Sequence, residues 1–231
     1  MHFGLNNTET FDNITNYIFN KFSSGNQYEK VVISIHGDFF HTDNFKSTTE
    51  KGTQLDTADF QNQIASGIIW LTTVIDYIIS STLPGDEQEI EIIYLKGNHA
   101  PSIDYMLMEV LKQRYMDVHQ LRIDSSLKEL KVSQFYNVSL FMHHGDKIRQ
   151  NKLISNIVSN YSSIWGRTTS RYIFTGHFHH EKSLADSGAV WYQLSSPSEH
   201  SKYDKDYGFA TAPSEQMVFE FDSHKRRHSI S

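Results

Sequence analysis

Short apolar segments rich in Val, Ile, Tyr and Phe recur along the chain, and amphipathic segments separate the earlier ones. Such short segments between turn residues are typical of β-strands. They lie at residues 31–35, 90–95, 138–142, 172–174, 190–194 and 217–221. Apolar residues at helical spacing predict helices at 11–22, 59–82, 103–115 and 148–163. The strand–helix–strand alternation predicts an α/β fold in which helices cover the faces of a sheet.

Two local details add to this prediction. Ser102 precedes the third helix and is expected to cap its first turn. The last two strands are separated by a long polar stretch, and we expect them to pair in antiparallel fashion.

The length and composition favour a single domain. The chain has 231 residues, of which 38% are hydrophobic and 13% aromatic, enough for one sizeable core. We expect one domain over residues 1–222 and a flexible basic tail over 223–231, which contains Lys225, Arg226 and Arg227.

Composition also narrows the function classes. The chain has no cysteine, so disulfides, thiolate metal sites and cysteine nucleophiles are excluded. The net charge of −6 disfavours a protein that coats nucleic acid, although Lys147, Arg149, Lys152, Arg167 and Arg171 are compatible with a local basic edge. No secretory signal is visible, and residues 68–81 are too short to span a membrane and predict a buried helix. We therefore expect a soluble, cytoplasmic protein without a membrane partner.

Four of the predicted strands are each followed by a glycine next to side chains that can bind metal. Because sites in α/β sheets form at the carboxyl ends of strands, we expect these four loops to converge. Glycine allows the sharp turns and close backbone approach that this needs. The four motifs are Gly37-Asp38, Gly97-Asn98-His99, His143-His144-Gly145-Asp146 and Gly176-His177-Phe178-His179.

The residue types indicate a metal centre without sulfur ligands. Imidazole, carboxylate and amide oxygen suit Mn, Fe or Zn. Asp38 is expected to bridge two divalent ions through its two oxygens, and His177 and His179 to lie in a turn and address different ions. Two such ions would activate a bridging water, and His99 would protonate the leaving group. A single motif of this kind is more often a hydrogen-bonded core or surface residue, so the prediction rests on the set.

The order of these motifs resembles the calcineurin-like metallophosphoesterase superfamily, and the resemblance runs nearly the whole chain. Residues 37–44, with Thr48-Thr49 and Gly52-Thr53, look like a phage- or plasmid-associated branch of uncharacterised members. Ser195-Ser196-Pro197-Ser198 and Tyr207-Gly208-Phe209 share that likeness. The resemblance implies a two-sheet α/β sandwich flanked by helices and a metal-dependent hydrolase of phosphate esters, in a bacterial or infected host cell.

The resemblance also assigns residues. Asp38 would bridge the ions, His2 and His179 would complete one of them, and His99 would lie near the scissile phosphate. The other ion would take Asn98, His144 and His177. His144 directly precedes a glycine and is preferred to His143, which, like His180, lies just outside the pattern. His41 and Asp43 would orient ligands or contact substrate, with a plain loop role equally open.

Two positions depart from the family pattern. The family opens on a strand ending in Asp-x-His, and His2 fits the histidine, but the Asp would precede Met1. We therefore expect the first strand to be missing, through a truncated product or a misassigned start. Ala100 replaces the usual Asp after Asn-His, which would weaken acid catalysis by His99.

The expected substrate is a phosphodiester or a phosphomonoester. Nucleic acids and nucleotides both belong to this class. A catalytically degenerate metal-binding or interaction module is the alternative, motivated by the missing Asp and Ala100. A misfolding fragment without its own function is the third. The natural substrate, the physiological metal and the oligomeric state are not indicated by the sequence.

Overall fold

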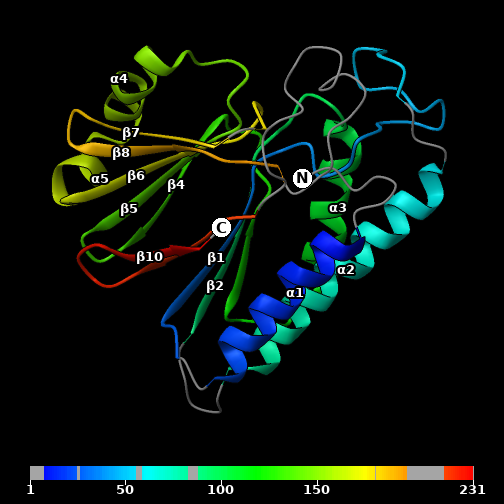
Figure 1. Ribbon diagram of the computed structural model, residues 1–231, viewed down its shortest axis with the longest axis horizontal. Coiled ribbons are helices and arrows are strands. Elements are labelled where there is room, and N and C mark those ends of the chain that lie inside the picture. The colour runs from blue at the N-terminus through cyan, green and yellow to red at the C-terminus, as the bar shows by residue number, and fades with distance from the viewer. Residues whose placement is uncertain are drawn as a thin grey trace.

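The computed structural model describes residues 8–24, 27–55, 59–82, 88–179, 181–196 and 216–230. Figure 1 shows two β-sheets between two groups of helices. Helices α1, α2 and α3 lie on one side of the sheets and α4 and α5 on the other, which gives an α/β/β/α arrangement.

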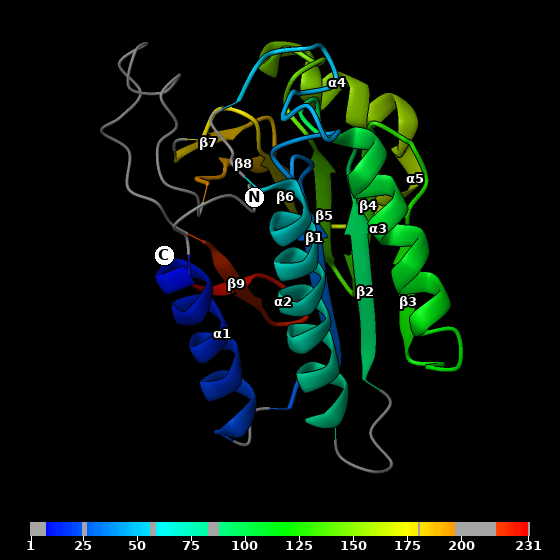
Figure 2. The ribbon, with the colours of Figure 1, turned by 90° about the vertical axis from the view of Figure 1, so that its right-hand side faces the viewer.

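The first sheet is parallel, with strand order β1-β2-β3. Its strands are β1 (Lys30–Ile35), β2 (Glu89–Tyr94) and β3 (Leu121–Asp124). Helices α1 (Thr8–Ser23), α2 (Phe60–Ser80) and α3 (Pro101–Arg114) run along its outer face, as Figure 2 shows. Apolar side chains from all three helices and from β1 and β2 form the core between them.

The second sheet has the order β4-β5-β6-β8-β7. Its strands are β4 (Leu130–Phe135), β5 (Val138–His143), β6 (Ser170–Thr175), β7 (Lys182–Asp186) and β8 (Ala189–Gln193). The central strands β5, β6 and β8 are parallel, and the edge strands β4 and β7 are antiparallel to their neighbours. Helices α4 (Gln150–Asn160) and α5 (Ser162–Arg167) cover its outer face.

The two sheets pack face to face. Because side chains alternate between the two faces of a strand, each strand contributes to the core between the sheets and to the core under the helices. In β2, Ile92 packs under the helices, whereas Ile93 belongs to the core between the sheets. In β5, Met142 joins Ile93 in that inter-sheet core, and Phe141 packs against α4 and α5. The expected α/β two-sheet sandwich flanked by helices is confirmed.

Helix α2 corresponds to the apolar segment expected to be a core helix. Among the described residues it is the one helix long and apolar enough to cross a membrane, a test that core helices also pass. Its buried face includes Leu71, Val74, Ile75 and Ile78, which pack against β1, β2 and α1. The structure therefore gives α2 a core role.

The end of the chain differs from expectation. Strand β9 (Val218–Phe221) does not pair with β8; it forms an antiparallel hairpin with β10 (Arg226–Ile230). The hairpin turn is held by the Asp222 carboxylate, which accepts hydrogen bonds of 2.8 Å from the backbone N–H groups of His224 and Lys225. Residues 226–230, which were expected to belong to a flexible tail, form strand β10. The missing first strand concerns residues outside those described.

Two local expectations are also corrected. The helix expected at 148–163 is two helices, α4 and α5, that meet at Tyr161, whose backbone leaves the helical region with φ −131° and ψ 36°. The Tyr161 hydroxyl donates to the Leu130 carbonyl at 2.7 Å, which ties this junction to β4. The prediction that Ser102 caps α3 is wrong, because the N-cap position is Ala100. The first backbone N–H groups of the helix bond to a side chain from another loop.

Candidate metal centre

The carboxyl ends of β1, β2, β5 and β6 bring four predicted ligands together. Asp38, His144 and His177 each offer a ligand atom, and these three atoms lie within 4.8 Å of one another. The Asn98 Oδ1 atom lies 3.0 Å from Nε2 of His144 and so joins the group. Asp38 and Asn98 come from the first sheet, and His144 and His177 from the second. We call these four residues the candidate metal centre.

Two glycines allow the loops of the first sheet to meet. A Cβ atom at Gly97 would lie 2.1 Å from Oδ1 of Asp38, and one at Gly37 would lie 2.6 Å from the Cα of Gly97. These distances are far below van der Waals contact, so both positions require glycine. Gly37 also has φ +82°, a conformation that other residues rarely adopt. The glycines that were predicted to allow sharp turns thus let the backbone of the loop after β1 lie against that of the loop after β2.

The Asp38 carboxylate has one satisfied oxygen and one that faces the histidines. Its Oδ1 accepts hydrogen bonds from the backbone N–H groups of Asn98 at 2.7 Å and His99 at 2.8 Å. Its Oδ2 is buried, accepts no such bond in the described part of the chain, and lies 3.4 Å from Nε2 of His144. Burial alone would raise the pKa of Asp38, but the contact with His144 and the other nearby donors outweigh it and lower the pKa. The carboxylate is therefore an anion in a buried site.

The tautomer of His144 is fixed by its surroundings. Nδ1 is hydrogen-bonded to the backbone carbonyl of His36, which can only accept, so Nδ1 carries a hydrogen. The other nitrogen, Nε2, faces two oxygens that also only accept, Oδ1 of Asn98 and Oδ2 of Asp38. Burial lowers the pKa of His144, but Asp38 outweighs that effect and raises it. Three acceptor positions therefore converge on a space that needs a cation, either a proton on Nε2 or a metal ion.

His177 and His179 both lie in the turn after β6. Their φ angles of +71° and +56° are unusual for residues other than glycine, and such strain is concentrated at functional sites. The turn directs His177 into the candidate metal centre, with its ring centroid 5.1 Å from that of His144. Burial lowers the pKa of His177, which keeps the imidazole neutral and able to bind metal. His179 is not a member of the group formed by the other ligands.

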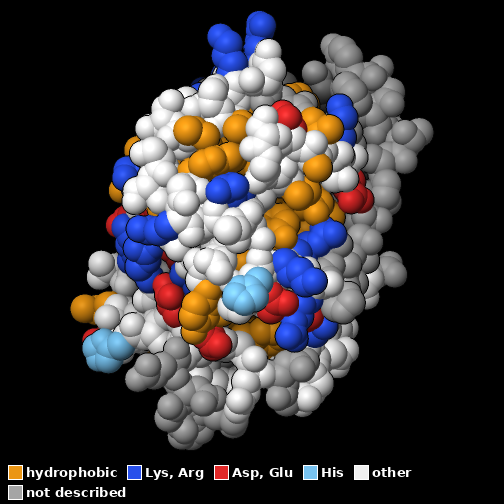
Figure 3. All heavy atoms as spheres, turned by 90° about the vertical axis from the view of Figure 1, so that its left-hand side faces the viewer, with side chains coloured by type: hydrophobic (Ala, Val, Ile, Leu, Met, Phe, Trp, Pro, Cys, Tyr) orange, Lys and Arg blue, Asp and Glu red, His pale blue; other side chains and the backbone are white. Residues whose placement is uncertain are grey.

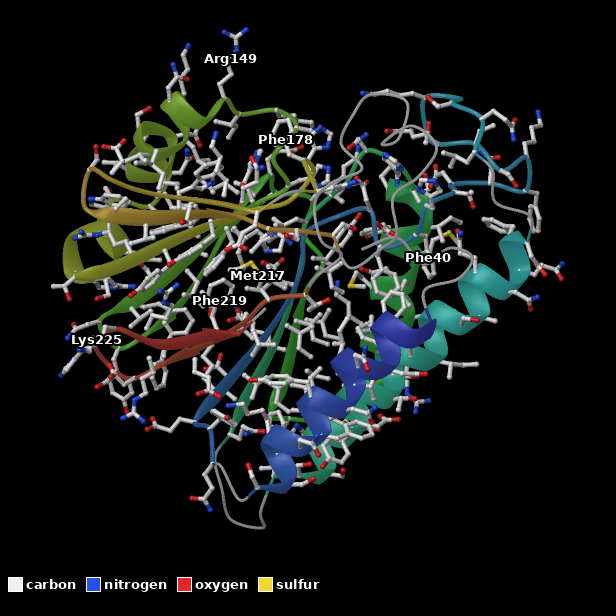
Figure 4. All side chains as sticks on the ribbon, in the orientation of Figure 1. Phe40, Arg149, Phe178, Met217, Phe219 and Lys225 are labelled. Carbon is white, nitrogen blue, oxygen red and sulfur yellow. The ribbon has the colours of Figure 1, made fainter. Side chains whose placement is uncertain are left out.

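Phe178 separates these two histidines and points outward. Its side chain is 51% exposed and lies at the end of the molecule where the strand-end loops meet, as Figure 4 shows. Its ring contacts that of His177, with 5.0 Å between centroids. An exposed aromatic ring therefore lies beside one residue of the candidate metal centre.

His99 is placed beside the candidate metal centre by its backbone. Its N–H donates to Asp38, and its ring Nδ1 lies 3.2 Å from Nδ1 of His41. His99 and His41 thus lie side by side, and the backbone of His99 contacts the buried carboxylate of Asp38. Asp43 is placed differently: its Oδ1 accepts from the backbone N–H groups of Ser102 at 3.0 Å and Ile103 at 3.2 Å, so it caps α3.

The remaining predicted residues lie off the centre or outside the described chain. His143 is fully buried, and its Nδ1 accepts from the backbone N–H of Gly145 at 2.8 Å. As the residue before His144 on β5, it points to the opposite face of the sheet. Burial lowers the pKa of His143. His2 and His180 lie outside the described residues.

Two residues that support the site were not predicted. Asp104 on α3 is fully buried, and its carboxylate accepts from the backbone N–H groups of Phe39 at 3.0 Å and Phe40 at 2.9 Å, which fixes the loop that carries Asp38. Burial, only partly offset by these hydrogen bonds, raises the pKa of Asp104 to about 7. An acidic residue on the same helical stripe as Leu107 and Leu111 was the available signal.

The other unpredicted residue is His36, which directly precedes Gly37. Its carbonyl receives the hydrogen bond from His144, and its side chain contacts Oγ of Ser34 through Nε2 at 3.0 Å. Burial lowers the pKa of His36 to about 3, so the ring is neutral. The His-Gly-Asp sequence was its signal, although nothing in it indicates that the backbone carbonyl is the functional atom.

Comparison with known proteins finds matches among solved structures alone. No protein-family model matches the chain, and no curated protein matches it. Among solved structures, wild-type Vps29 complexed with zinc from Entamoeba histolytica is 14% identical, with a TM-score of 0.38, covering 84% of this chain and 86% of that one. A predicted phosphoesterase from Streptococcus pneumoniae TIGR4 is 11% identical, with a TM-score of 0.33, covering 74% and 73%. Because both TM-scores are below 0.5, the likeness establishes neither an activity nor a ligand for this chain.

Proposed function

We propose that this protein is a metal-dependent hydrolase of phosphate esters. The observation that carries the proposal is the convergence of Oδ2 of Asp38, Oδ1 of Asn98 and Nε2 of His144 on one buried space. Neither of the two oxygens can donate a hydrogen bond. Oδ2 of Asp38 also accepts none in the described part of the chain. A buried anionic oxygen without a partner is costly unless a cation neutralises it. A divalent ion fits this donor set.

The residues around this space suit a metal of intermediate hardness. A carboxylate, an amide oxygen and two imidazoles are ligands for Mn, Fe or Zn, and we propose Mn as the most suitable. The hydrogen bond from Nδ1 of His144 to a backbone carbonyl orients the ring so that Nε2 faces the ion, a common support for metal-binding histidines.

We also propose a second ion, as expected from the motifs, held by His179 together with His2. Asp38 would be the residue shared by the two. Its Oδ1 already accepts two backbone N–H groups, and its Oδ2 has no hydrogen bond in the described part of the chain.

The chemistry follows from these positions. Divalent ions, when bound, would lower the pKa of a water molecule and offset the charge of the phosphate. The water oxygen attacks phosphorus, and the bond to the leaving oxygen breaks with its electron pair on that oxygen. His99 gives the leaving oxygen a proton, and the proton lost by the attacking water passes to solvent, from which His99 is recharged. Asp38 holds His99 in place through the backbone N–H.

The substrate is proposed to be a phosphodiester or phosphomonoester of small size, such as a nucleotide. Three of the five basic side chains that could attract a long nucleic acid are already engaged: Lys147 with Glu129, Arg167 with Gln134, and Arg171 with the Trp165 carbonyl. Figure 3 shows that face of the molecule, where basic and acidic side chains are interspersed. Arg149 projects away from the rest of the molecule (Figure 4).

The proposal is tested by metal content and hydrolysis measured together. Purified protein loaded with Mn, Fe or Zn would be analysed for bound metal and assayed with bis(4-nitrophenyl) phosphate and 4-nitrophenyl phosphate. We expect bound metal and hydrolysis of at least one ester in the native chain, and loss of both in Asp38→Asn. Asp117→Asn changes an exposed Asp and serves as the control. Full activity in Asp38→Asn, or bound metal without hydrolysis of either ester, would contradict the proposal.

A further inference from the structure

Strand β7 forms an open edge of the second sheet. In the order β4-β5-β6-β8-β7 it lies last, so one of its sides pairs with β8 and no described strand pairs with the other. Figure 2 shows it at the margin of the sheet, beyond β8. All five of its residues, Lys182–Asp186, are exposed. Such an edge offers a row of backbone N–H and C=O groups to which another strand can bond.

The turn between β7 and β8 determines which backbone groups face this edge. It is a two-residue turn, Ser187-Gly188, with φ values of +47° and +79°, the positive values of a tight hairpin turn. Asp186 and Ala189 flank the turn and therefore form a hydrogen-bonded pair. Because hydrogen-bonded and non-hydrogen-bonded positions alternate along an antiparallel pair, the backbone groups of Ser183 and Ala185 point away from β8.

The side chains of β7 place opposite charges at its two ends. Leu184 and Asp186 line a small cavity with Ile154 of α4, so they lie on the outer face of the sheet. Lys182 shares that face, because side chains alternate along a strand. Leu184 is 47% exposed, and neither Lys182 nor Asp186 forms an ion pair with another described residue. The outer face of β7 therefore carries a cation, an exposed leucine and an anion in turn.

We propose that β7 is the docking edge for β7 of a second copy of this chain. The two strands pair in antiparallel fashion about a two-fold axis at Leu184. Ser183 of each copy then lies opposite Ala185 of the other, and their outward backbone groups bond to one another. Lys182 of each copy lies opposite Asp186 of the other, at a non-hydrogen-bonded position where side chains come closest. The two leucines meet between these ion pairs.

The charge pattern is the reason for choosing a second copy as the partner. A strand with opposite charges at positions symmetric about its centre is complementary to itself in antiparallel pairing, whereas a shift by two residues would place Lys182 opposite Leu184. A partner strand without the reversed charges would leave both charges of β7 unpaired. The other edge strand of this sheet, β4, lacks the pattern: its one charged residue, Lys131, is 2% exposed and already pairs with Asp124.

The dimer is expected to be weak, because a five-residue strand gives a short ladder. It would bury less surface than the roughly 1,200 Å² of standard interfaces, so we expect a Kd of about 10–100 µM. The pairing uses none of the four residues of the candidate metal centre. It therefore does not rest on the phosphoesterase function, and loss of metal binding or of hydrolysis would leave it standing.

The experiment follows the sedimentation of the full chain from about 1 to 500 µM, a range that brackets this Kd. Lys182→Asp and Asp186→Lys each place like charges opposite one another in a homodimer. An equimolar mixture of the two variants restores opposite charges in a heterodimer. Lys128→Asp changes an exposed lysine between β3 and β4 by the same charge and is the matched control.

We expect the native chain and Lys128→Asp to approach twice the chain mass of 26.8 kDa at the highest concentrations. Lys182→Asp and Asp186→Lys should each dimerise about tenfold more weakly, because two opposite-charge pairs become like-charge pairs. Their mixture should recover the native affinity. A native chain that stays monomeric throughout would overturn the proposal. So would a dimer that neither charge reversal weakens, because it would form through another surface.

A second readout reports on the backbone of β7. The amide hydrogens of Ser183 and Ala185 should exchange slowly at high protein concentration and rapidly at low concentration. Ala185→Pro removes one outward N–H without touching a bond to β8, so it should abolish the dimer and leave the melting temperature of the monomer nearly unchanged. Slow exchange of both amides in a monomer would show that the protein itself covers this edge, which also overturns the proposal.

Discussion

At the scale of single residues, the site depends on two positions where no side chain fits. Gly37 and Gly97 let the loops after β1 and β2 touch, and this contact places the backbone N–H groups of Asn98 and His99 against Oδ1 of Asp38. Those two hydrogen bonds turn the other oxygen of Asp38 toward the histidines. The two glycines therefore determine the orientation of the Asp38 carboxylate through the path of the backbone.

Gly97→Ala should disrupt the candidate metal centre. The new methyl group would lie 2.1 Å from Oδ1 of Asp38, so the carboxylate and its loop must move. We expect at least a tenfold loss of metal affinity and a destabilisation of about 1–3 kcal/mol. Isothermal titration with Mn and chemical denaturation would measure the two effects.

Gly166→Ala is the matched control for this substitution. Gly166 lies in α5, where a Cβ atom would meet nothing within 4 Å. Alanine favours the helix, so this variant should gain about 0.4–1 kcal/mol and bind metal as the native chain does. Unchanged metal binding in Gly97→Ala would show that the close approach of the two loops is not needed.

The residues brought together at the site were predictable to the extent that they follow strands. Asp38, Asn98, His144 and His177 each lie in the loop that follows a strand, and parallel strands end at a common edge. Asp104 and the carbonyl of His36 could not be found in this way. Asp104 acts on the backbone N–H groups of Phe39 and Phe40, and His36 acts through its own backbone carbonyl, and a backbone group carries no sequence signal.

At the scale of secondary-structure elements, β2 carries a buried charge between the two sheets. Glu91 is 1% exposed and forms ion pairs with Lys30 of β1 at 3.0 Å and with Arg122 of β3. Across the gap between the sheets it accepts a hydrogen bond of 2.5 Å from the hydroxyl of Ser133 on β4. One carboxylate thus links three strands of one sheet to a strand of the other.

Glu91→Gln should weaken this link more than a change at the surface would. A buried ion pair that loses one partner costs about 3–5 kcal/mol, whereas an exposed pair contributes about 0–1 kcal/mol. Glu89→Gln is the control, because Glu89 pairs with the same Lys30 but is half exposed. Urea denaturation of both variants measures the difference, and equal losses would show that Glu91 acts as a surface charge.

The same residue predicts a pH dependence. Burial raises the pKa of Glu91, but the bonds from Ser133, Arg122 and Lys30 outweigh burial and lower it below its usual 4.5. Its contribution to stability is therefore complete above pH 4.5 and lost as the pH falls through the lower value of the folded state. Glu91→Gln should show a smaller loss of stability over that acid range.

The elements themselves were predicted where they are apolar. Six strands and the first three helices lie near the expected residues, because burial on both faces requires continuous apolar segments. Strands β3, β4, β7 and β10 were missed because they lie at sheet edges, where polar residues alternate with apolar ones or predominate. The capping of α3 by Asp43 was missed because the cap comes from a distant loop.

At the scale of the whole molecule, the candidate metal centre lies where the two sheets meet. Each sheet supplies two of its four residues, and the hydrogen bond from His144 to the carbonyl of His36 joins β5 to β1 across the gap. A bound ion would therefore connect the two halves of the sandwich. Its binding energy would add to the packing that holds them together.

We expect divalent metal to raise the thermal stability of the native protein. An ion that binds only the folded state adds about 2.7 kcal/mol when present at 100 times its Kd. The melting temperature should rise with added Mn and fall back with a chelator, as measured by calorimetry. Asp38→Asn should show no rise, and a rise of the same size in that variant would place the ion elsewhere.

The division of the ligands between the two sheets has a consequence for the order of events during synthesis. Asp38 leaves the ribosome early, but His144 and His177 emerge only after the first sheet and its helices are complete. An ion held at the candidate metal centre could not nucleate the folding of the amino-terminal half, unlike in a small metal-folded module whose ligands are close in sequence. The chain must therefore assemble its hydrophobic layers before the four residues of the candidate metal centre can come together.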